Sequence, residues 1–258
     1  SATREVRCRL GERDPAVLEE ADGGLDGGAA RDRGVTLTPA LLRRMSGPGL
    51  AIPYLTGRPE LQLVERLVAA YPGLADGRGW GARFGRELNR SDDTPLFSRR
   101  RTGMPVVEGK HIDPFGVRLR DCELRVANPD GLPGPALREA VRRHRLAYRD
   151  VASATNRLTL IAAIVPPGAV TVHTLYCLRE AMPIDDQIVL CCMLNSFTAN
   201  FLARLWVTTH LGTATVERLP VPRPPAASWA AGRLRELGRE LLESGGRNPA
   251  AYAEAQGL

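Results

Sequence analysis

Lysine is almost absent from this chain. Among 258 residues, Lys110 is the only lysine in a set of 35 basic residues, so the other 34 are arginines, and the formal net charge is +6. Such a surplus indicates a polyanionic partner, and arginine suits phosphate and guanine because its planar fork donates two parallel hydrogen bonds. A GC-rich genome produces the same arginine bias without any functional meaning, so the composition leaves both interpretations open.

Cysteine is present in a pattern that disfavours two of its common uses. There are five cysteines, an odd number, and they contain no Cys-x-x-Cys spacing. They are Cys8, Cys122, Cys177, Cys191 and Cys192. The pattern argues against a secreted disulfide framework and against a zinc site, and it predicts free thiols in a reducing cytosol. The histidines His111, His173 and His210 show no metal-ligand spacing either.

Long hydrophobic runs are also missing. The best candidate for a bilayer-spanning stretch is interrupted by Pro166 and Pro167, and no segment reaches the ~20 apolar residues that a membrane helix needs. No signal peptide precedes the first predicted elements. We therefore expect a cytoplasmic protein without membrane contact. The chain begins at Ser1 and not at a methionine, which is typical of a fragment cut from a longer protein.

The motifs of adenine-N6 methylation are absent as well. That reaction needs a glycine-rich turn for S-adenosylmethionine and a loop of the type Asn/Asp-Pro-Pro-Tyr/Phe, which holds the extruded adenine. The nearest match, Ala-Asn-Pro-Asp at residues 127–130, lacks the second proline and the aromatic residue. The Asp-Gly-Gly turns at residues 22–24 and 26–28 follow no buried strand. We therefore expect no catalytic residues, no cofactor and no methyl transfer in this chain alone.

Hydrophobic periodicity predicts a chain of the α+β class. Predicted strands cover residues 105–108, 116–120, 158–165, 169–178 and 213–217. Predicted helices begin at Pro39 and Pro59 and cover residues 135–147, 185–206 (the longest) and 229–242. The helix at 135–147 is basic, with Arg138, Arg142, Arg143 and Arg145 around its polar side. The glycine-rich stretch at residues 22–34 is expected to be a flexible surface loop.

Five blocks of sequence occur in an order that is typical of one known family. They are Glu-Leu-Asn-Arg-Ser-Asp-Asp at residues 87–93, Val-Val-Glu-Gly-Lys-His-Ile at 106–112, Tyr-Arg-Asp at 148–150 with Thr-Asn-Arg-Leu-Thr-Leu-Ile at 155–161, Leu-Asn-Ser-Phe at 194–197, and Arg-Leu-Pro-Val-Pro at 218–222. This order resembles the TaqI-like C-terminal specificity domain (target recognition domain) of restriction-modification adenine-N6 DNA methyltransferases, of the type IIG and type II methylase kind. The resemblance covers roughly residues 34–225.

The resemblance implies a mixed, mainly antiparallel recognition sheet packed on the helix at residues 185–206. Residues 1–100 would form a helical connector region, 101–225 the target recognition domain, and 226–258 a C-terminal helix and tail. The implied function is sequence-specific recognition of double-stranded DNA in a restriction-modification or phage-defence system. The implied partner, besides the DNA, is a catalytic methyltransferase domain of the same parent chain, and that domain would bind S-adenosylmethionine.

Twelve residues are candidates for DNA contact. They are Arg99, Arg100 and Arg101 for phosphates, Lys110 and His111 after the turn at Gly109, Arg149, Asn156 and Arg157 around a loop, and Thr208, Thr209, His210 and Thr213 after the longest helix. For each group, a solvated loop without DNA contact is the alternative. Asn195 and Ser196 lie on the apolar helix, and we expect their polar atoms to bond to neighbouring backbone.

Two functions from other classes stay open. Glu108 and Lys110 have the Glu-x-Lys form of many metal-dependent nucleases, with Asp92 and Asp93 upstream; in such sites carboxylates hold Mg²⁺ and the lysine stabilises charge. The pattern is common by chance, and residues 109–112 also fit a Gly-x-x-Ile stretch of the specificity domains. A protein-interaction module is the third alternative, because a genomic arginine bias would imply no DNA binding.

Overall fold

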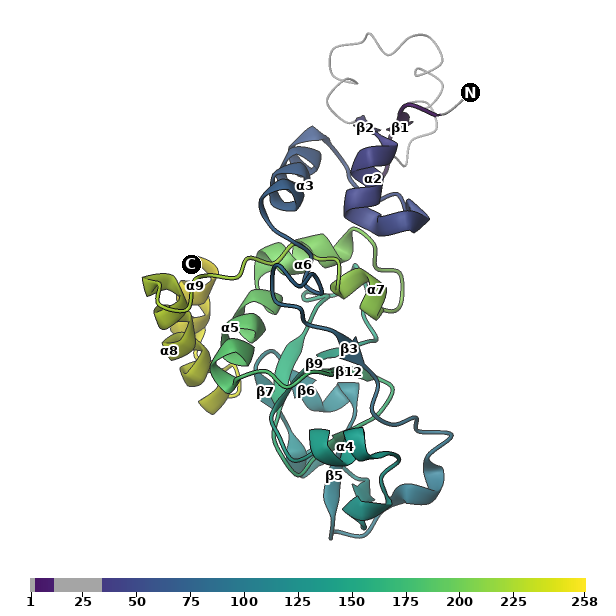
Figure 1. The fold of residues 1–258 in the computed structure, drawn as a ribbon, viewed down its shortest axis with the longest axis vertical. Coiled ribbons are helices and arrows are strands. Elements are labelled where there is room, and N and C mark those ends of the chain that lie inside the picture. Colours follow the sequence, from purple (N-terminus) through teal and green to yellow (C-terminus); the bar gives the residue numbers. More distant parts are fainter. Residues whose placement is uncertain (1–2, 12–33) are drawn as a thin grey trace.

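The computed structural model describes residues 3–11 and 34–258, so the predicted flexible loop lies, up to residue 33, outside the described residues. At one end of the molecule, β1 (Val6–Cys8) and β2 (Val35–Leu37) pair antiparallel beside α2 (Pro39–Ser46) and α3 (Arg58–Ala70) (Figure 1). Both helices have a proline in the first turn, as predicted. Thr38 caps α2, because its Oγ1 accepts a hydrogen bond from the Leu41 N–H at 3.2 Å.

A four-stranded antiparallel sheet lies in the middle of the molecule. Its order is β10 (Ala162–Val165), β9 (Arg145–Arg149), β12 (Leu175–Leu178) and β3 (Phe84–Gly85). Tyr148 of β9 pairs with Ala162 on one side and Tyr176 on the other. Its ring packs against Phe84 with centroids 5.1 Å apart, so a residue far upstream in the sequence completes this sheet.

A second four-stranded sheet continues toward the end opposite β1 and β2 (Figure 1). Its order is β11 (Val170–Thr171), β5 (Met104–Val107), β8 (Arg125–Val126) and β4 (Phe97–Ser98). The pair β11–β5 is parallel, whereas the pairs β5–β8 and β8–β4 are antiparallel. The hairpin β6 (Ile112–Asp113) and β7 (Gly116–Val117) lies next to β10. The predicted α+β class with mixed, mainly antiparallel pairing is therefore confirmed.

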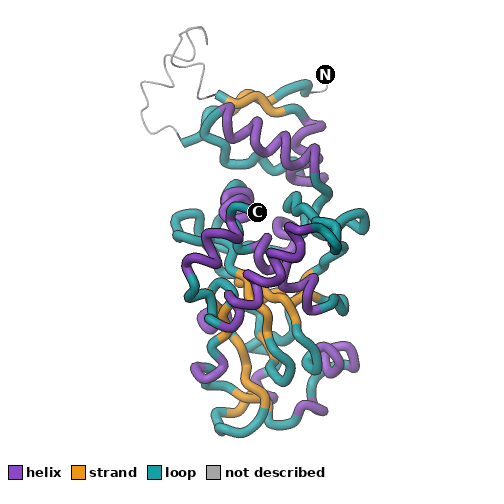
Figure 2. Tube along the Cα trace, turned by 90° about the vertical axis from the view of Figure 1, so that its left-hand side faces the viewer, coloured by secondary structure: helices purple, strands orange, loops and turns teal. Residues whose placement is uncertain are grey.

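Helices cover the central sheet in two layers. In the first layer α5 (Ile184–Leu194) packs on β10 and β9, and in the second α8 (Trp229–Glu243) packs on α5 and α9 (Pro249–Gln256). Figure 2 shows helices gathered between the N-terminal end and the strands of the two sheets. Shorter helices are α4 (Pro135–Ala140), α6 (Phe197–Arg204), α7 (Thr213–Val216) and the 3-10 turns Gly47–Gly49, Thr94–Leu96, Gly109–His111, Leu119–Asp121 and Pro129–Gly131. Within residues 3–11 and 34–258, no helix has the length and apolar character required to cross a bilayer.

The predicted helix at residues 185–206 is two helices, α5 and α6, separated at Asn195 and Ser196. The Asn195 side chain bonds to β10 instead of facing solvent: its Oδ1 accepts from the Ala162 N–H at 3.0 Å and its Nδ2 donates to the Ala162 carbonyl at 2.9 Å. Ser196 Oγ caps α6 by accepting from the Ala199 N–H at 3.0 Å. The expectation that both residues bond to backbone is therefore confirmed, although the uninterrupted helix was wrong.

Several further elements differ from the prediction; for instance, the predicted strand at residues 169–178 is the two strands β11 and β12, which belong to different sheets. Residues 213–217 were predicted as a strand, but Thr213–Val216 form α7, in which the Gly212 carbonyl accepts hydrogen bonds from the Thr215 and Val216 N–H groups. The predicted basic helix at 135–147 ends at Ala140, and Arg145 opens β9. Arg145 is 1% exposed, so the prediction that it lies on the polar face of a helix was wrong.

Arg145 instead forms a buried ion pair that joins the two sheets. Its Nε donates to Glu87 Oε1 at 2.6 Å, and its other nitrogens donate to the carbonyls of Ala140, Arg143 and Ala169. The second oxygen of Glu87 accepts from the Thr171 N–H at 2.7 Å and from the Thr171 hydroxyl at 2.9 Å. Because Arg145 is in β9 and Thr171 is in β11, the pair connects the central sheet to the second sheet.

The crossing of α5 and α8 depends on a glycine. A Cβ at Gly238 would lie 2.4 Å from Ile188 Cγ2 and 3.0 Å from Cys192 Sγ. We expect Gly238→Ala to lower the free energy of unfolding by about 1–3 kcal/mol, because the helices must separate. A Cβ at Gly232 of the same helix would meet no neighbouring atom within 4 Å, so Gly232→Ala should stabilise by about 0.5–1 kcal/mol. Urea unfolding of both variants tests this, and equal effects of the two would contradict the close crossing.

Candidate nucleic-acid interface

A tight turn follows β5 at Gly109–His111. The His111 N–H donates to the Glu108 carbonyl at 2.8 Å, and His111 Nδ1 accepts from the Glu108 N–H at 3.0 Å. His111 is 3% exposed, and this burial is the main cause of a pKa below the ordinary value for histidine. A neutral ring that accepts a backbone hydrogen bond closes the turn, so the structure gives no support to the prediction that His111 contacts bases.

Arg149 holds the same turn from β9. Its Nε donates to the Gly109 carbonyl at 2.9 Å and its Nη2 donates to the Ile112 carbonyl at 2.7 Å. A side chain at position 109 would meet the Thr174 carbonyl at 3.1 Å, which explains the glycine. Burial, and then the nearby charge of Arg118, lower the pKa of Arg149 below the ordinary value. Arg149 is therefore first of all a structural support of the turn.

Lys110 is the exposed residue of the turn, and it pairs with Glu108. Lys110 Nζ lies 3.2 Å from Glu108 Oε2, and Arg90 binds the other oxygen of the same carboxylate. Burial tends to raise the pKa of Glu108, but the hydrogen bonds from Lys110 and Arg90 outweigh it, and the net pKa is lowered. Two cations thus occupy the carboxylate that a nuclease would use for Mg²⁺.

One of the two upstream carboxylates of the nuclease hypothesis, that of Asp93, is occupied too. Asp93 Oδ2 accepts a hydrogen bond from the Asn89 N–H at 2.7 Å, within its own turn. Across residues 3–11 and 34–258, no three His, Cys, Asp or Glu side chains lie together in a way that could hold a metal ion. The geometry of the described residues therefore offers no support for the Glu-x-Lys nuclease.

The three arginines that were predicted to contact phosphates, Arg99, Arg100 and Arg101, line a hollow of about 680 Å³, which we call the Arg100 hollow. Its lining comprises Arg99, Arg100, Arg101, Arg120, Asp121, Cys122, Glu123 and Arg125. The loop between β4 and β5 contributes the three consecutive arginines, all of them exposed. Five arginines against two carboxylates make this hollow strongly cationic, and guanidinium groups in such numbers suit phosphate oxygens.

A second hollow, of about 1010 Å³, contains the other predicted loop, and we call it the Arg157 hollow. Its charged lining is Arg118, Arg149, Arg157, Arg247 and Asp113, and its polar and aromatic lining includes Asn156, Phe197 and Tyr252. The cationic residues come from the segment after β7, from β9, from the loop before β10 and from the loop between α8 and α9. Segments far apart in the sequence therefore converge on one cationic depression.

Arg118 joins the two hollows to the Gly109 turn. Its guanidinium donates to Asp113, which lines the Arg157 hollow, and to Asp121 at 3.1 Å, which lines the Arg100 hollow. The same side chain donates to the Lys110 carbonyl. We call the two hollows with this turn the arginine surface. Its described lining contains nine arginines and three carboxylates, so its local charge is far more positive than the chain average.

The loop that carries Asn156 and Arg157 is fixed through its backbone. Arg204 of α6 donates to the carbonyls of Asn156 at 2.9 Å and Arg157 at 2.5 Å. Asn200 Oδ1 accepts from the N–H groups of Thr159 at 2.8 Å and Leu160 at 2.9 Å. The side chains of Asn156 and Arg157 are exposed on this fixed backbone. A rigid loop that presents an amide and a guanidinium is suited to hydrogen bonding with base edges.

The last predicted group lies apart from both hollows. Thr208, Thr209 and His210 are exposed, and His210 Nδ1 lies 3.3 Å from Asp150 Oδ2, which also accepts from Arg86 at 3.1 Å. Thr213 is the half-buried first residue of α7. These residues are not part of the lining described for either hollow. The arginine surface, which contains the predicted arginines, Lys110 and Asn156, therefore does not include them.

Sequence reasoning missed five residues of the arginine surface: Arg118, Arg120, Arg125, Arg247 and Phe197. The arginines are single residues in separate segments, and one-dimensional spacing gives no sign that they meet. Phe197 was placed on an uninterrupted apolar helix and was assigned no role there. The Asn195-Ser196 pair was the available signal, because Ser followed by a helical segment is a typical N-cap.

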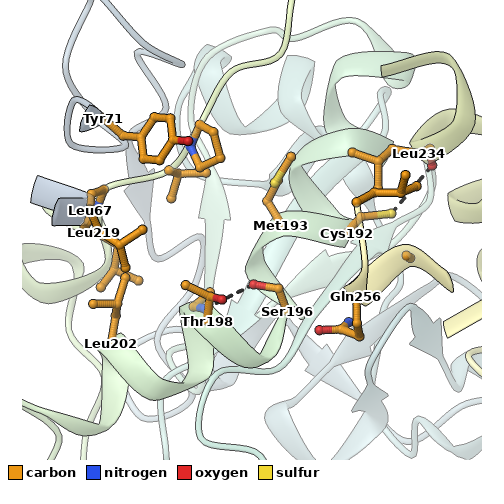
Figure 3. A pocket seen from close by; sticks show the side chains of 16 residues that line it. Leu67, Tyr71, Cys192, Met193, Ser196, Thr198, Leu202, Leu219, Leu234 and Gln256 are labelled. Atoms are coloured by element: carbon orange, nitrogen blue, oxygen red, sulfur yellow. Dashed lines mark hydrogen bonds between the residues drawn. The ribbon is translucent and has the colours of Figure 1, made fainter. Parts of the chain in front are cut away.

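An apolar pocket of about 230 Å³ lies elsewhere, between α3, α5, α6 and the two C-terminal helices. Figure 3 shows Leu67 and Tyr71 on one side of it and Leu234 and Gln256 on the other, with Met193 between them. None of the described side chains that line it is charged. Phosphate would find no partner there, so the arginine surface is the candidate nucleic-acid site.

No family model matches the chain, and no curated protein matches it. Among solved structures, a similar chain comes from work on complex assembly and conformational transition of the type I R-M (restriction-modification) system. The TM-score is 0.34 and the sequence identity 11%, and the match covers 93% of this chain and 64% of that one. The chain thus spans just under two thirds of the length of its structural neighbour. A TM-score this low carries no argument, so the function has to be inferred from the residues themselves.

Proposed function

We propose that the chain is a DNA-recognition module of a restriction-modification or phage-defence system, and that it binds double-stranded DNA through the arginine surface. The observation that supports this most is the convergence of nine arginines from separate segments on two adjoining hollows. Arginines that are spread by genomic bias would have no reason to gather on one part of the surface. Guanidinium groups suit phosphate oxygens, which supply most of the affinity in protein–DNA complexes.

Within this proposal the two parts of the surface have different roles. The Arg100 hollow binds phosphates and sets the register of the protein on the duplex, as Arg99, Arg100 and Arg101 were expected to do. Lys110, Asn156 and Arg157 present exposed polar groups from fixed backbones, and their chemistry matches guanine and adenine edges in the major groove. Thr208, Thr209 and His210 would lie outside the main contact.

The finer proposal follows from the sequence resemblance. The chain would be the C-terminal specificity part of an adenine-N6 DNA methyltransferase, and a separate catalytic domain of the same parent chain would bind S-adenosylmethionine and transfer the methyl group. This chain would then contribute affinity and sequence choice. With S-adenosylmethionine alone, the isolated chain should transfer no methyl group to DNA, which radiolabelled transfer assays can measure.

The proposal is tested by binding of the chain to a fluorescent duplex in anisotropy titrations at several salt concentrations. We expect affinity to fall steeply with salt, because bound phosphates release counterions. Replacing Arg99, Arg100 and Arg101 together by alanine should weaken binding about tenfold or more and reduce the slope of log K against log salt by up to about 3. All sequences should be affected about equally.

The matched control removes the same charge from another part of the molecule. Arg43, Arg44 and Arg66 are exposed residues of α2 and α3, away from both hollows. Their triple alanine variant has the same net charge as the test variant and should lose much less affinity. Equal losses in the two variants would indicate binding by overall charge alone, and no duplex binding at low salt would refute the proposal.

A further inference from the structure

Phosphate binding does not explain the presence of Phe197 in the Arg157 hollow. Phe197 is the first residue of α6 and is 63% exposed, although phenylalanine is usually buried. It lines the hollow together with the exposed Arg157 and Arg247. Duplex DNA offers phosphates and base edges to a protein, but its stacked bases leave no free face. An exposed aromatic ring beside guanidinium groups would therefore have no base to stack on in an intact double helix.

The ring has a rigid support. Phe197 packs edge-on against Tyr252, with centroids 6.2 Å apart, and Tyr252 packs edge-on against the buried Phe115 at 5.9 Å. The Tyr252 hydroxyl donates to the Asn195 carbonyl at 2.8 Å. The Phe197 N–H donates to Gln256 Oε1 at 2.7 Å, which ties the start of α6 to α9. These contacts fix the position of the Phe197 ring in the lining of the hollow.

Groups that could bind the rest of a nucleotide line the same hollow as the ring. Arg157 and Arg247 supply guanidinium groups for a phosphate, and Asn156 supplies an amide that can both donate to and accept from a base edge. The hollow, at about 1010 Å³, is of a size that admits a whole nucleotide. Aromatic stacking with nearby arginines is the way that proteins bind unpaired bases.

We propose that the Arg157 hollow binds an unpaired nucleotide of DNA, whose base stacks on Phe197 and whose phosphate is held by Arg157 and Arg247. This inference rests on the proposed DNA binding and adds to it. The arginine surface would bind a duplex at a position where one nucleotide is unpaired and unstacked. The Arg100 hollow would hold the paired DNA beside it.

The test compares a labelled duplex with the same duplex carrying a one-nucleotide bulge, both measured by anisotropy at one salt concentration. The bulged DNA should bind about tenfold more tightly, as one base stacked on an aromatic ring contributes. Phe197→Ala and Phe197→Leu should abolish this preference, so that each variant binds the bulged and the plain duplex with equal affinity. Phe197→Trp should retain the preference, because tryptophan supplies a stacking face.

The outcomes separate the inference from the proposed function. If the duplex binds but the bulge adds nothing, or if Phe197→Ala keeps the preference, the stacking site is refuted and duplex recognition stands. If neither DNA binds, both proposals fall. If Phe197→Ala changes no DNA affinity but dissociates a self-associated form in analytical ultracentrifugation, the ring is a protein contact and the inference is wrong. Circular dichroism of each variant confirms that the exposed position tolerates the change.

Discussion

Replacing Glu87 by alanine is expected to lower the free energy of unfolding by about 3–5 kcal/mol, because it leaves the Arg145 guanidinium buried without its counter-charge. Arg145 and Glu87 have side chains 1% and 7% exposed, so water cannot take the place of the lost carboxylate. The Thr171 N–H and hydroxyl would lose their acceptor as well. Urea unfolding followed by circular dichroism measures the change.

A second variant distinguishes the cost of leaving one charge buried and unpaired from the cost of losing the ion pair. The double replacement Glu87→Leu with Arg145→Met removes both charges and keeps most of the volume, so it should recover much of the lost stability. An exposed pair serves as a control: Arg233 binds Glu254 at 2.6 Å on the surface, and Arg233→Ala should hardly shift the unfolding midpoint. A Glu87→Ala variant as stable as the wild type would contradict the burial of the pair.

Replacing Asn200 by alanine is the second change with a large expected effect, about 2–4 kcal/mol, since two buried N–H groups would lose their acceptor. These groups belong to Thr159 and Leu160, which are 1% and 0% exposed. Both N–H groups should then exchange with deuterium much faster than in the wild type. The neighbouring Asn156→Ala, at an exposed position, should leave stability unchanged.

The same variant connects stability with the proposed function. With Asn200 removed, the loop at residues 153–159 keeps only Arg204 as its anchor from α6, so the side chains of Asn156 and Arg157 would lose their fixed positions. We expect weaker selectivity between duplex sequences, with affinity for nonspecific DNA nearly unchanged. Unaltered exchange of the Thr159 and Leu160 N–H groups would show that the loop does not depend on Asn200.

Local signals in the sequence predicted the elements that have local causes. The Thr38 cap and the first-turn proline of α2 are such causes, and so is the first-turn proline of α3; both helices begin within one residue of the predicted start. The predicted helix at residues 229–242 corresponds to α8. Residues 213–217 show the limit. Thr213, Thr215 and Val216 favour a strand by propensity, but in the described structure the segment forms the short helix α7.

The sequence does not predict the environment of a single charged residue where tertiary contacts decide it. Arg145 follows three other basic residues in the sequence, and only its ion pair with a residue 58 positions away explains why it is buried. Lys110 and His111 are neighbours with opposite environments, one exposed and one buried. The predicted arginines at 99–101 do line a hollow, yet the arginines that complete the surface come from segments that no spacing rule links.

The way in which the loop at residues 153–159 is fixed has a consequence for retargeting. Arg204 binds the carbonyls of residues 156 and 157, and a carbonyl is present whichever side chain the residue bears. The loop also closes on itself through the Asn156 N–H and the Ser153 carbonyl, at 3.1 Å. Positions 156 and 157 can therefore be randomised together without touching the bonds that shape the loop. A library at these two positions would sample new base preferences on an unchanged scaffold, which is how a family of specificities could diversify from one fold.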